Sequence, residues 1–305
     1  MFFIINRNAS QSIGCQIFLK RILPLLKKSG IAFDFRITNN QEEAQKACQE
    51  AILKGEKIIV ACGGDGTVNL IGRELMGTDV ALGVLPLGTS NDFAIASLGM
   101  PQNPKKALEA LMSGARIQAD VGLVDKLIFL NVFSIGIDAD IDHLAHKHPI
   151  FRRLPFKELR YGLPMINELQ NPNIRQVRIE IDGRVAFEGE TFFVGVHNGK
   201  REGSYFPINL QGSISDGILN LLVIEDLPSL QERLKYVIQM TTGKLDRLPR
   251  LHTFEGKEIK IIIEDEDEDD DILSAQVDGE PIELPTNTIK ISVLPKVLWV
   301  ITNDH

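Results

Sequence analysis

Residues 57–69, "KIIVACGGDGTVN", place an apolar run before a turn with three glycines, and the expected fold class follows from them. The run predicts a buried strand, and the residues after the turn have helical spacing. A strand, a glycine-rich turn and a helix in this order expose backbone amides to an anion. The turn lacks the Gly-Lys-Ser/Thr ending of one phosphate loop and the G-x-G-x-x-G spacing of another. The alternative is a tight turn in which Asp65 caps the helix.

The surrounding sequence alternates between strand and helix patterns. Strands are predicted at 2–6, 33–38 and 81–86, and helices at 16–30 and 40–55. Strands that alternate with helices form a parallel sheet, and ligands bind beyond the carboxyl ends of its strands. We therefore predict an α/β domain with a mostly parallel sheet.

A second loop, "LPLGTSNDF" at residues 85–93, follows the next predicted strand. Gly88 bends the chain, Thr89 and Ser90 supply hydroxyl groups, and Asn91-Asp92 can cap the next helix. Two such loops at neighbouring strand ends suggest one phosphate-bearing ligand that both of them hold.

After residue 117 the pattern changes to strands separated by turn residues, which indicates an antiparallel sandwich or meander. A single helix, at residues 227–243, interrupts it. We predict a nucleotide-binding domain at 1–122 and a β-rich antiparallel sandwich domain at 123–305, whose last strand is a candidate to return to the first domain.

The composition of the 305 residues, 44% hydrophobic and 24% charged, is that of an ordinary globular protein. The sequence has no apolar run of membrane-spanning length and no secretory signal pattern, so the expected location is the cytoplasm. The net charge of −8 comes from the acidic run 264–271, "EDEDEDDD". Because the remainder is neutral, we expect no nucleic-acid partner.

"GGDGTVN" followed by "LPLGTSNDFA" resembles the diacylglycerol kinase catalytic-domain family, in particular its soluble bacterial lipid kinases. Weaker matches follow in the family's order: "NVFSIGIDA" at 131–139, "SDGILNL" at 215–221 and "VDGE" at 277–280. The resemblance implies an α/β nucleotide domain followed by a β-rich domain. It also implies transfer of the ATP γ-phosphoryl group to a lipid hydroxyl, with Mg²⁺.

The resemblance assigns roles to residues of this chain. The positions that it implies for ATP binding are Asn6, Thr38, Gly63, Gly64, Asp65, Gly66, Thr67, Asn69, Thr89 and Asn91. It implies a structural Mg²⁺ site at Asp216 with backbone carbonyls near Ser213 and Ile218, and it makes Asp120 a member of an acidic network near the phosphates.

The resemblance implies that the general base is Asp278 or Glu280, with Asp65 as a further catalytic carboxylate. A carboxylate within reach of a lipid hydroxyl would serve as that base. Asp-Gly between strands is also a hairpin turn, and "IDGRV" at 181–185 contains the same dipeptide. Spacing alone does not distinguish Asp182 from Asp278.

The chain departs from the family pattern at three places. The first turn reads "NRNAS", without the family's proline and closing glycine, and Ile95 stands where the family usually has arginine. The stretch 197–207, "HNGKREGSYFP", has fewer glycines than the family's. These departures bear on substrate and efficiency more than on the type of reaction.

The segment 143–164, "HLAHKHPIFRRLPFKELRYGLP", mixes bases with apolar residues, which is typical of contact with an anionic membrane and also of a loop packed between domains. The expected partners are a lipid substrate at a membrane surface and, as an alternative to a monomer, a second copy of the chain. Two other functions stay open: a kinase of a soluble substrate such as NAD, and a nucleotide-binding regulator without catalysis.

Overall fold

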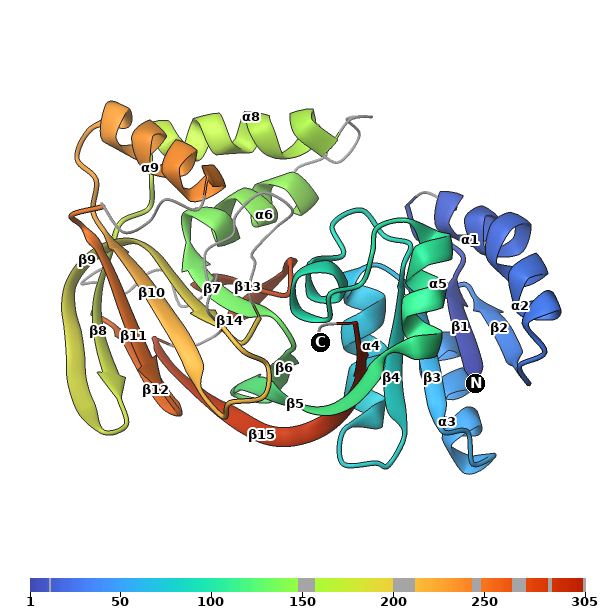
Figure 1. Cartoon of the computed structure of the whole chain (residues 1–305). Coiled ribbons are helices and arrows are strands. Elements are labelled where there is room, and N and C mark those ends of the chain that lie inside the picture. The colour runs from blue at the N-terminus through green and yellow to red at the C-terminus, as the bar shows by residue number, and fades with distance from the viewer. Residues whose placement is uncertain are drawn as a thin grey trace. The chain divides into compact units, whose positions relative to one another are not determined.

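The computed structural model describes residues 1–10, 12–147, 157–199, 212–242, 248–264, 273–284 and 287–303. The chain forms two compact units (Figure 1). Unit 1 contains Met1–Val121, Ser213–Gly217 and Leu294–His305, and unit 2 contains Gly122–Gly212 and Ile218–Val293. Each unit is described by itself below.

Unit 1 contains a parallel sheet whose strands follow the order β2-β1-β3-β4-β15. Its strands are β1 (Phe2–Asn6), β2 (Asp34–Thr38), β3 (Ile58–Gly63), β4 (Ala81–Pro86) and the end of β15 (Thr288–Thr302). β5 (Ala115–Val124) begins in this unit and pairs with β15. β3 and β4 are buried along nearly their whole length, as expected of parallel strands covered on both faces. The predicted α/β class is confirmed.

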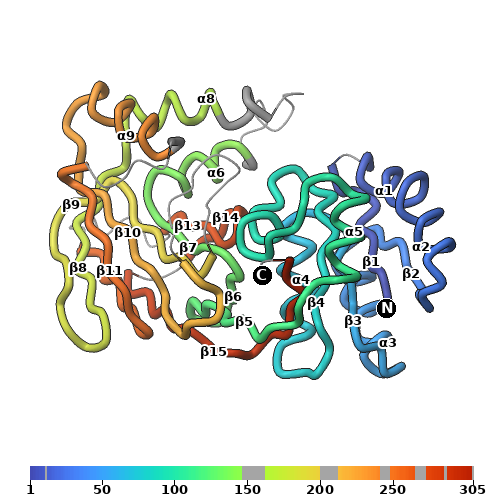
Figure 2. Tube along the Cα trace, in the orientation of Figure 1, coloured from blue at the N-terminus to red at the C-terminus, as the bar shows by residue number. Residues whose placement is uncertain are grey.

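The helices of unit 1 alternate with these strands along the trace (Figure 2). They are α1 (Ile13–Ile17), the π-helical segment η1 (Phe18–Ile22), α2 (Leu23–Ser29), α3 (Gln41–Leu53), α4 (Asp65–Leu75), the π-helical segment η2 (Phe93–Ser97) and α5 (Pro104–Ser113). Gly30, with a left-handed φ of 71°, ends α2, and the Asn40 side chain caps α3 by accepting the Glu43 N–H at 2.8 Å. The predicted helices at 16–30 and 40–55 are therefore confirmed.

Unit 2 contains an antiparallel sheet with the order β14-β13-β7-β9-β8-β12-β15, and β10 and β11 extend it from β9. Its strands are β6 (Leu127–Phe129), β7 (Val132–Gly136), β8 (Arg175–Ile181), β9 (Arg184–His197), β10 (Leu219–Glu225), β11 (Leu251–Gly256), β12 (Glu258–Ile263), β13 (Leu273–Val277) and β14 (Glu280–Leu284). The first half of β9 pairs with β8, and its second half lies between β7 and β10. The predicted β-rich antiparallel character is confirmed.

β10 separates two hydrophobic cores in unit 2. Leu219, Leu221 and Val223 enter a core that also receives alternate residues of β8 and β12. Leu222 and Ile224, on the opposite face, enter a second core built with helices. This alternation follows from the two-residue period of a strand.

The second core lies beneath three helices, drawn above β9 and β10 in Figure 1. They are α6 (Ile137–Lys147), α8 (Lys157–Gln170) and α9 (Leu230–Thr242). The helix predicted at 227–243 corresponds to α9, but the prediction of a single helix is wrong.

The sequence did not predict helices α6 and α8, for two different reasons. α6 follows β7 directly, so its apolar residues Ile137 and Ile141 read as a continuation of the strand. α8 contains Gly162 and Pro164, and both residue types disfavour a helix interior. Burial of Leu169 in the second core offsets that preference.

Three sequence features fall wholly or partly outside the described residues. They are most of the acidic run 264–271, residues 148–156 of the segment 143–164, and residues 200–207 of the glycine-poor stretch. None of the helices in the described ranges combines the length and the hydropathy that a membrane span requires.

Candidate functional site

Three loops meet at the carboxyl-terminal ends of the unit 1 strands. We name them loop 1 (residues 7–10, after β1), loop 2 (residues 63–67, at the end of β3) and loop 3 (residues 87–92, after β4). The Leu87 N–H in loop 3 donates to the Gly63 carbonyl in loop 2 at 3.0 Å, and the Ser10 hydroxyl in loop 1 donates to the Leu87 carbonyl at 3.2 Å. The two glycine-containing loops predicted to share a ligand are thus neighbours.

The glycines of loops 2 and 3 allow the two backbones to touch. A Cβ atom on Gly88 would lie 2.2 Å from the Gly64 Cα and 2.7 Å from the Gly64 nitrogen. Both distances are too short for any side chain at position 88. A Cβ atom on Gly64 would in turn lie 3.2 Å from the Gly88 Cα. These glycines are therefore explained by the contact between the loops, before any ligand is considered.

Asp65 links loop 2 to loop 3. It is the first residue of α4, but Gly64 is the N-cap and no side chain caps that helix. The Asp65 carboxylate instead accepts the Phe93 N–H at 3.2 Å, at the start of η2. Burial raises the pKa of Asp65, and the N–H groups of Phe93, Asp92 and Asn91 oppose the rise. The carboxylate therefore holds the start of η2, which follows loop 3. It does not cap its own helix, α4, which was the alternative interpretation of the sequence.

Asn6 and Thr38 lie at the ends of β1 and β2. The Asn6 amide donates to the Thr67 hydroxyl at 3.0 Å, and its oxygen accepts the Asn8 N–H at 2.9 Å. The Thr38 hydroxyl is buried and donates to the Ile5 carbonyl at 3.3 Å. Both residues thus contribute to the backbone arrangement at this edge of the sheet.

The remaining predicted nucleotide positions differ in exposure. The Asn91 side chain is buried and makes two bonds with Gly88, accepting its N–H at 2.9 Å and donating to its carbonyl at 3.0 Å. Thr89 is exposed, whereas Gly66 and Asn69, in the first turns of α4, are half-buried. Asn91 therefore shapes loop 3, and the start of α4 presents backbone amides and a helix dipole that suit a phosphate.

Asp120 is a buried carboxylate that fastens the turn predicted to bind Mg²⁺. Its oxygens accept the N–H groups of Gly217 at 2.6 Å and Lys296 at 2.8 Å, and its own N–H donates to Ile214 at 2.6 Å. Asp216 lies exposed in this turn, and Ser213 precedes it with its hydroxyl 3.3 Å from that of Ser215. Ile218 directly follows Gly217 and is the first residue of the chain after this turn that belongs to unit 2.

No cluster of three or more His, Cys, Asp or Glu side chains suited to a metal occurs among the described residues. A metal at the "SDG" turn would therefore depend on the Asp216 carboxylate, main-chain carbonyl oxygens and water. Mg²⁺ accepts such an oxygen set, since it binds few carboxylates and retains water.

Asp278 anchors two turns of unit 2 to each other. It has a left-handed φ of 49°, and its carboxylate accepts the N–H groups of Leu130 at 2.8 Å, Asn131 at 2.8 Å and Val132 at 2.9 Å. Glu280, two residues later, is exposed at the start of β14. Asp278 is thus held firmly in place, while Glu280 faces solvent.

Asp182 makes the same kind of contact in the other Asp-Gly turn. Its φ is 48°, and its carboxylate accepts the N–H groups of Lys257 at 3.1 Å and Glu258 at 3.0 Å. Local geometry therefore does not separate Asp278 from Asp182, just as sequence spacing does not.

A buried polar network behind the Asp278 turn has no counterpart in the sequence predictions. The Gln276 amide donates to the Ser134 hydroxyl at 2.7 Å and to the Asp138 carboxylate at 3.2 Å, and its oxygen accepts the Gly279 N–H at 2.6 Å. The Ser134 hydroxyl also donates to Asp138. Ser134 and Asp138 both lie in the motif at 131–139, so that motif was the feature of the sequence from which this network could have been suspected.

Asp140 is a second carboxyl group that the sequence predictions omit. Burial raises its pKa to about 7, repulsion from Glu168 adds to the rise, the Arg175 guanidinium opposes it, and Asp138 adds a smaller repulsion. Its Oδ2 atom is buried and has no hydrogen-bond partner among the described residues. Asp140 thus holds a proton more tightly than an exposed aspartate.

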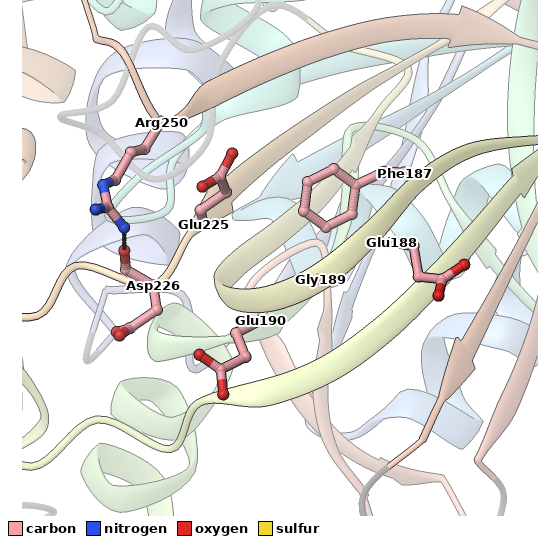
Figure 3. Close-up of a pocket in the computed structure, with 7 residues that line it drawn as sticks. All are labelled: Phe187, Glu188, Gly189, Glu190, Glu225, Asp226 and Arg250. Carbon is pink, nitrogen blue, oxygen red and sulfur yellow. Dashed lines mark hydrogen bonds between the residues drawn. The ribbon is translucent and has the colours of Figure 1, made fainter.

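A pocket of about 290 Å³ opens in unit 2 (Figure 3). Its lining residues are Phe187, Glu188, Gly189, Glu190, Glu225, Asp226 and Arg250. The Arg250 guanidinium donates to the Asp226 carbonyl at 2.7 Å, and the four acids outnumber this one base. Such a lining repels a triphosphate, and none of the predicted site residues belongs to it.

Known proteins resemble this chain over most of its length. The family model "Diacylglycerol kinase catalytic domain" matches residues 1–124, and "YegS C-terminal NAD kinase beta sandwich-like domain" matches residues 131–302. The probable lipid kinase YegS of Escherichia coli is 31% identical over 225 residues, which cover 71% of this chain and 74% of that protein. The protein of the same name from Salmonella typhimurium is 31% identical over 220 residues, which cover 70% of this chain and 72% of that protein.

Two solved structures from Bacillus anthracis have a similar fold. A putative diacylglycerol kinase, as its structure is named, superposes with a TM-score of 0.74 at 25% identity, covering 99% of this chain and 96% of that one. A second structure of that name gives a TM-score of 0.75 at 23% identity over the same shares, and shows the fold alone.

The close contact between loops 2 and 3 predicts that a methyl group added at Gly88 lowers both the stability of the protein and its affinity for ATP. Gly88→Ala should lower the free energy of unfolding by about 2 kcal/mol, because its Cβ would push the Gly64 backbone away. The same displacement should weaken ATP binding at least tenfold in calorimetric titration. The matched control is Gly77→Ala, which has a φ of 70° but open space around it. It should lose about 1 kcal/mol of stability and keep its ATP affinity. Wild-type affinity in Gly88→Ala would contradict this account of the loops.

Asp140 predicts a pH-dependent stability difference. Its pKa is higher in the folded than in the unfolded protein, so stability falls as the pH rises from about 4 to about 7. An asparagine side chain cannot ionise, so the gain in unfolding free energy from Asp140→Asn should be about 4 kcal/mol larger at pH 8 than at pH 4. Urea titrations at both pH values measure it. An equal gain at the two pH values would show that Asp140 does not hold its proton in the folded state.

Proposed function

The chain belongs to the YegS-like lipid kinases of the diacylglycerol kinase family, and we propose that it transfers the γ-phosphoryl group of ATP to the hydroxyl of diacylglycerol or a related lipid alcohol. The observation that carries this proposal is the convergence of loops 2 and 3 at the start of α4, which suits a polyphosphate. Phosphoryl transfer needs mainly positioning and charge neutralisation, and rigid backbone loops provide the positioning.

On this proposal, the triphosphate binds to backbone amides of loop 2 and the first turn of α4. Asp65 keeps loop 3 beside them through Phe93, and Asn6 orients Thr67. Mg²⁺ would neutralise phosphate charge when bound. The Asp216 carboxylate and the carbonyls of Ser213 and Ile218 would hold a separate structural Mg²⁺.

We assign the general-base role to Asp278, with Glu280 as the alternative. A base acts only from a fixed position within reach of the hydroxyl, and three backbone N–H groups fix Asp278. Glu280 is exposed and reorients more readily. Backbone N–H groups hold the Asp182 carboxylate in the same way. A fixed carboxylate is therefore a requirement for the base but does not identify it.

We propose that the reaction takes place at the cytoplasmic side of a membrane, where ATP is present and a peripheral protein can reach a lipid. A homodimer is proposed as an alternative to the monomer. Nucleic acid is not proposed as a partner, because the charge outside the acidic run is balanced.

The reaction itself is tested with γ-labelled ATP and Mg²⁺, supplied with diacylglycerol in detergent micelles or with NAD. We expect label in the lipid and none in NAD, and we expect Asp65→Ala to abolish transfer because loop 3 loses its anchor. Label in NAD would indicate a kinase of a soluble substrate. ATP binding without transfer to any lipid of a mixed extract would indicate a regulator. Either result would contradict the proposal.

The two Asp-Gly turns offer a matched pair for the general base. Both Asp278→Asn and Asp182→Asn remove a carboxylate that accepts backbone N–H groups, so both should lose stability. Only Asp278→Asn should lower kcat, by about 10² to 10⁴, with the KM for ATP unchanged. Equal activity of the two variants, compared at equal folded fractions, would assign Asp278 to the turn and leave Glu280 as the candidate base.

A further inference from the structure

Exposed apolar side chains concentrate on two helices of unit 2. Within the described chain ten large hydrophobic side chains are exposed, and half of these ten lie on α8 and α9. These five are Leu163, Ile166, Leu230, Leu234 and Ile238. Leu230, Leu234 and Ile238 recur at every fourth residue, so they form a stripe along α9. We call the outward sides of the two helices the α8–α9 face.

The exposed apolar residues of this face take no part in the packing that holds the two helices on unit 2. Tyr236 and Met240 of α9 and Leu169 of α8 are buried in the second core. The Arg233 side chain of α9 donates to the Leu169 carbonyl of α8 at 3.1 Å, which ties the helices together. Ile238 nevertheless remains 63% exposed and Ile166 55% exposed. Folding of unit 2 does not require these side chains to be apolar, so their exposure points to a partner.

The charge of the α8–α9 face suits an anionic partner. Lys235 is exposed between Leu234 and Ile238. Of the two acids whose side chains are described on these helices, Glu168 is buried, and Glu232 is half-buried and accepts a hydrogen bond from the Ser229 hydroxyl at the helix start. On a chain with a net charge of −8, the one exposed charged side chain among those described on these two helices is thus a lysine.

We propose that the α8–α9 face docks on the surface of a lipid bilayer that contains anionic lipids, an inference that rests on the proposed lipid kinase function. Helices with leucine and isoleucine on one face and lysine among them lie in the interface of a membrane, with the apolar side chains among the acyl chains. Anionic headgroups attract the lysine. The substrate of a lipid kinase resides in such a bilayer, so the enzyme needs a face of this kind.

The direct test is co-sedimentation with vesicles of equal parts phosphatidylethanolamine and phosphatidylglycerol. The variant Leu163→Gln/Ile166→Gln/Leu234→Gln/Ile238→Gln should bind these vesicles at least tenfold more weakly than wild type. The control Leu53→Gln/Met112→Gln changes exposed apolar residues of unit 1, with Leu53 87% exposed, and should bind as wild type does. Unchanged binding of the four-residue variant would overturn the proposal, and so would equal losses in the variant and the control.

A second measurement separates this proposal from the catalytic one. With dioctanoyl-diacylglycerol dispersed as monomers, the four-residue variant should phosphorylate as fast as wild type, whereas with diacylglycerol in the vesicles its rate should fall at least tenfold. Equal loss on both substrates would overturn the membrane role. If wild type phosphorylated neither substrate but bound the vesicles, the catalytic proposal would fail while docking stood. A dimer in sedimentation velocity that the variant converts to a monomer would show that a second copy covers the face.

Discussion

Gly64 and Gly88 meet backbone to backbone, and the other contacts among the strand-end loops are arranged around that meeting. The Leu87 N–H bonds to Gly63 on one side of it, and Asn91 closes loop 3 on the other. Any side chain at Gly88 would overlap the Gly64 backbone, so the approach is possible only for glycine. A packed interior cannot absorb such an overlap without displacing its neighbours. The constraint therefore reaches Asp65 and the start of α4, on which the proposed nucleotide site depends.

Carboxylates act throughout this chain as links between backbone segments. Asp65 holds the start of η2, Asp120 holds Gly217 and Lys296, and Asp182 and Asp278 each hold a neighbouring turn. A carboxylate can accept several hydrogen bonds, and each bond to a charged group contributes about 1.5–3 kcal/mol. These acids thus have a structural reason to be present that is separate from catalysis. A loss of activity after replacing one of them is informative only when stability is measured beside it.

Helices α8 and α9 of unit 2 have apolar side chains both on the side that faces the sheet and on the side that faces solvent. Their inner faces complete the second core over β9 and β10, and the outer faces of α8 and α9 keep leucine and isoleucine in solvent. The first use explains why α8 forms in spite of Gly162 and Pro164, since burial of Leu169 in the second core offsets a poor local preference. The second use has no explanation within the unit, which is why a bilayer surface is proposed for it.

Local sequence patterns were enough to predict the alternation of strands and helices in the first unit, the antiparallel strands of the second and the family. These depend on periodicity, on glycine at chain reversals and on motif spacing, which are local properties. The folded structure was needed to show that the Gly64 and Gly88 backbones touch and that Asp65 caps a different segment from its own helix. It was also needed to show that Asp278 and Asp182 are held by the same kind of backbone contact. The same holds for the network of Gln276 with Ser134 and for the pKa of Asp140. Those features join residues far apart in the chain or depend on burial from several elements, and no local pattern records which distant backbone a side chain will meet.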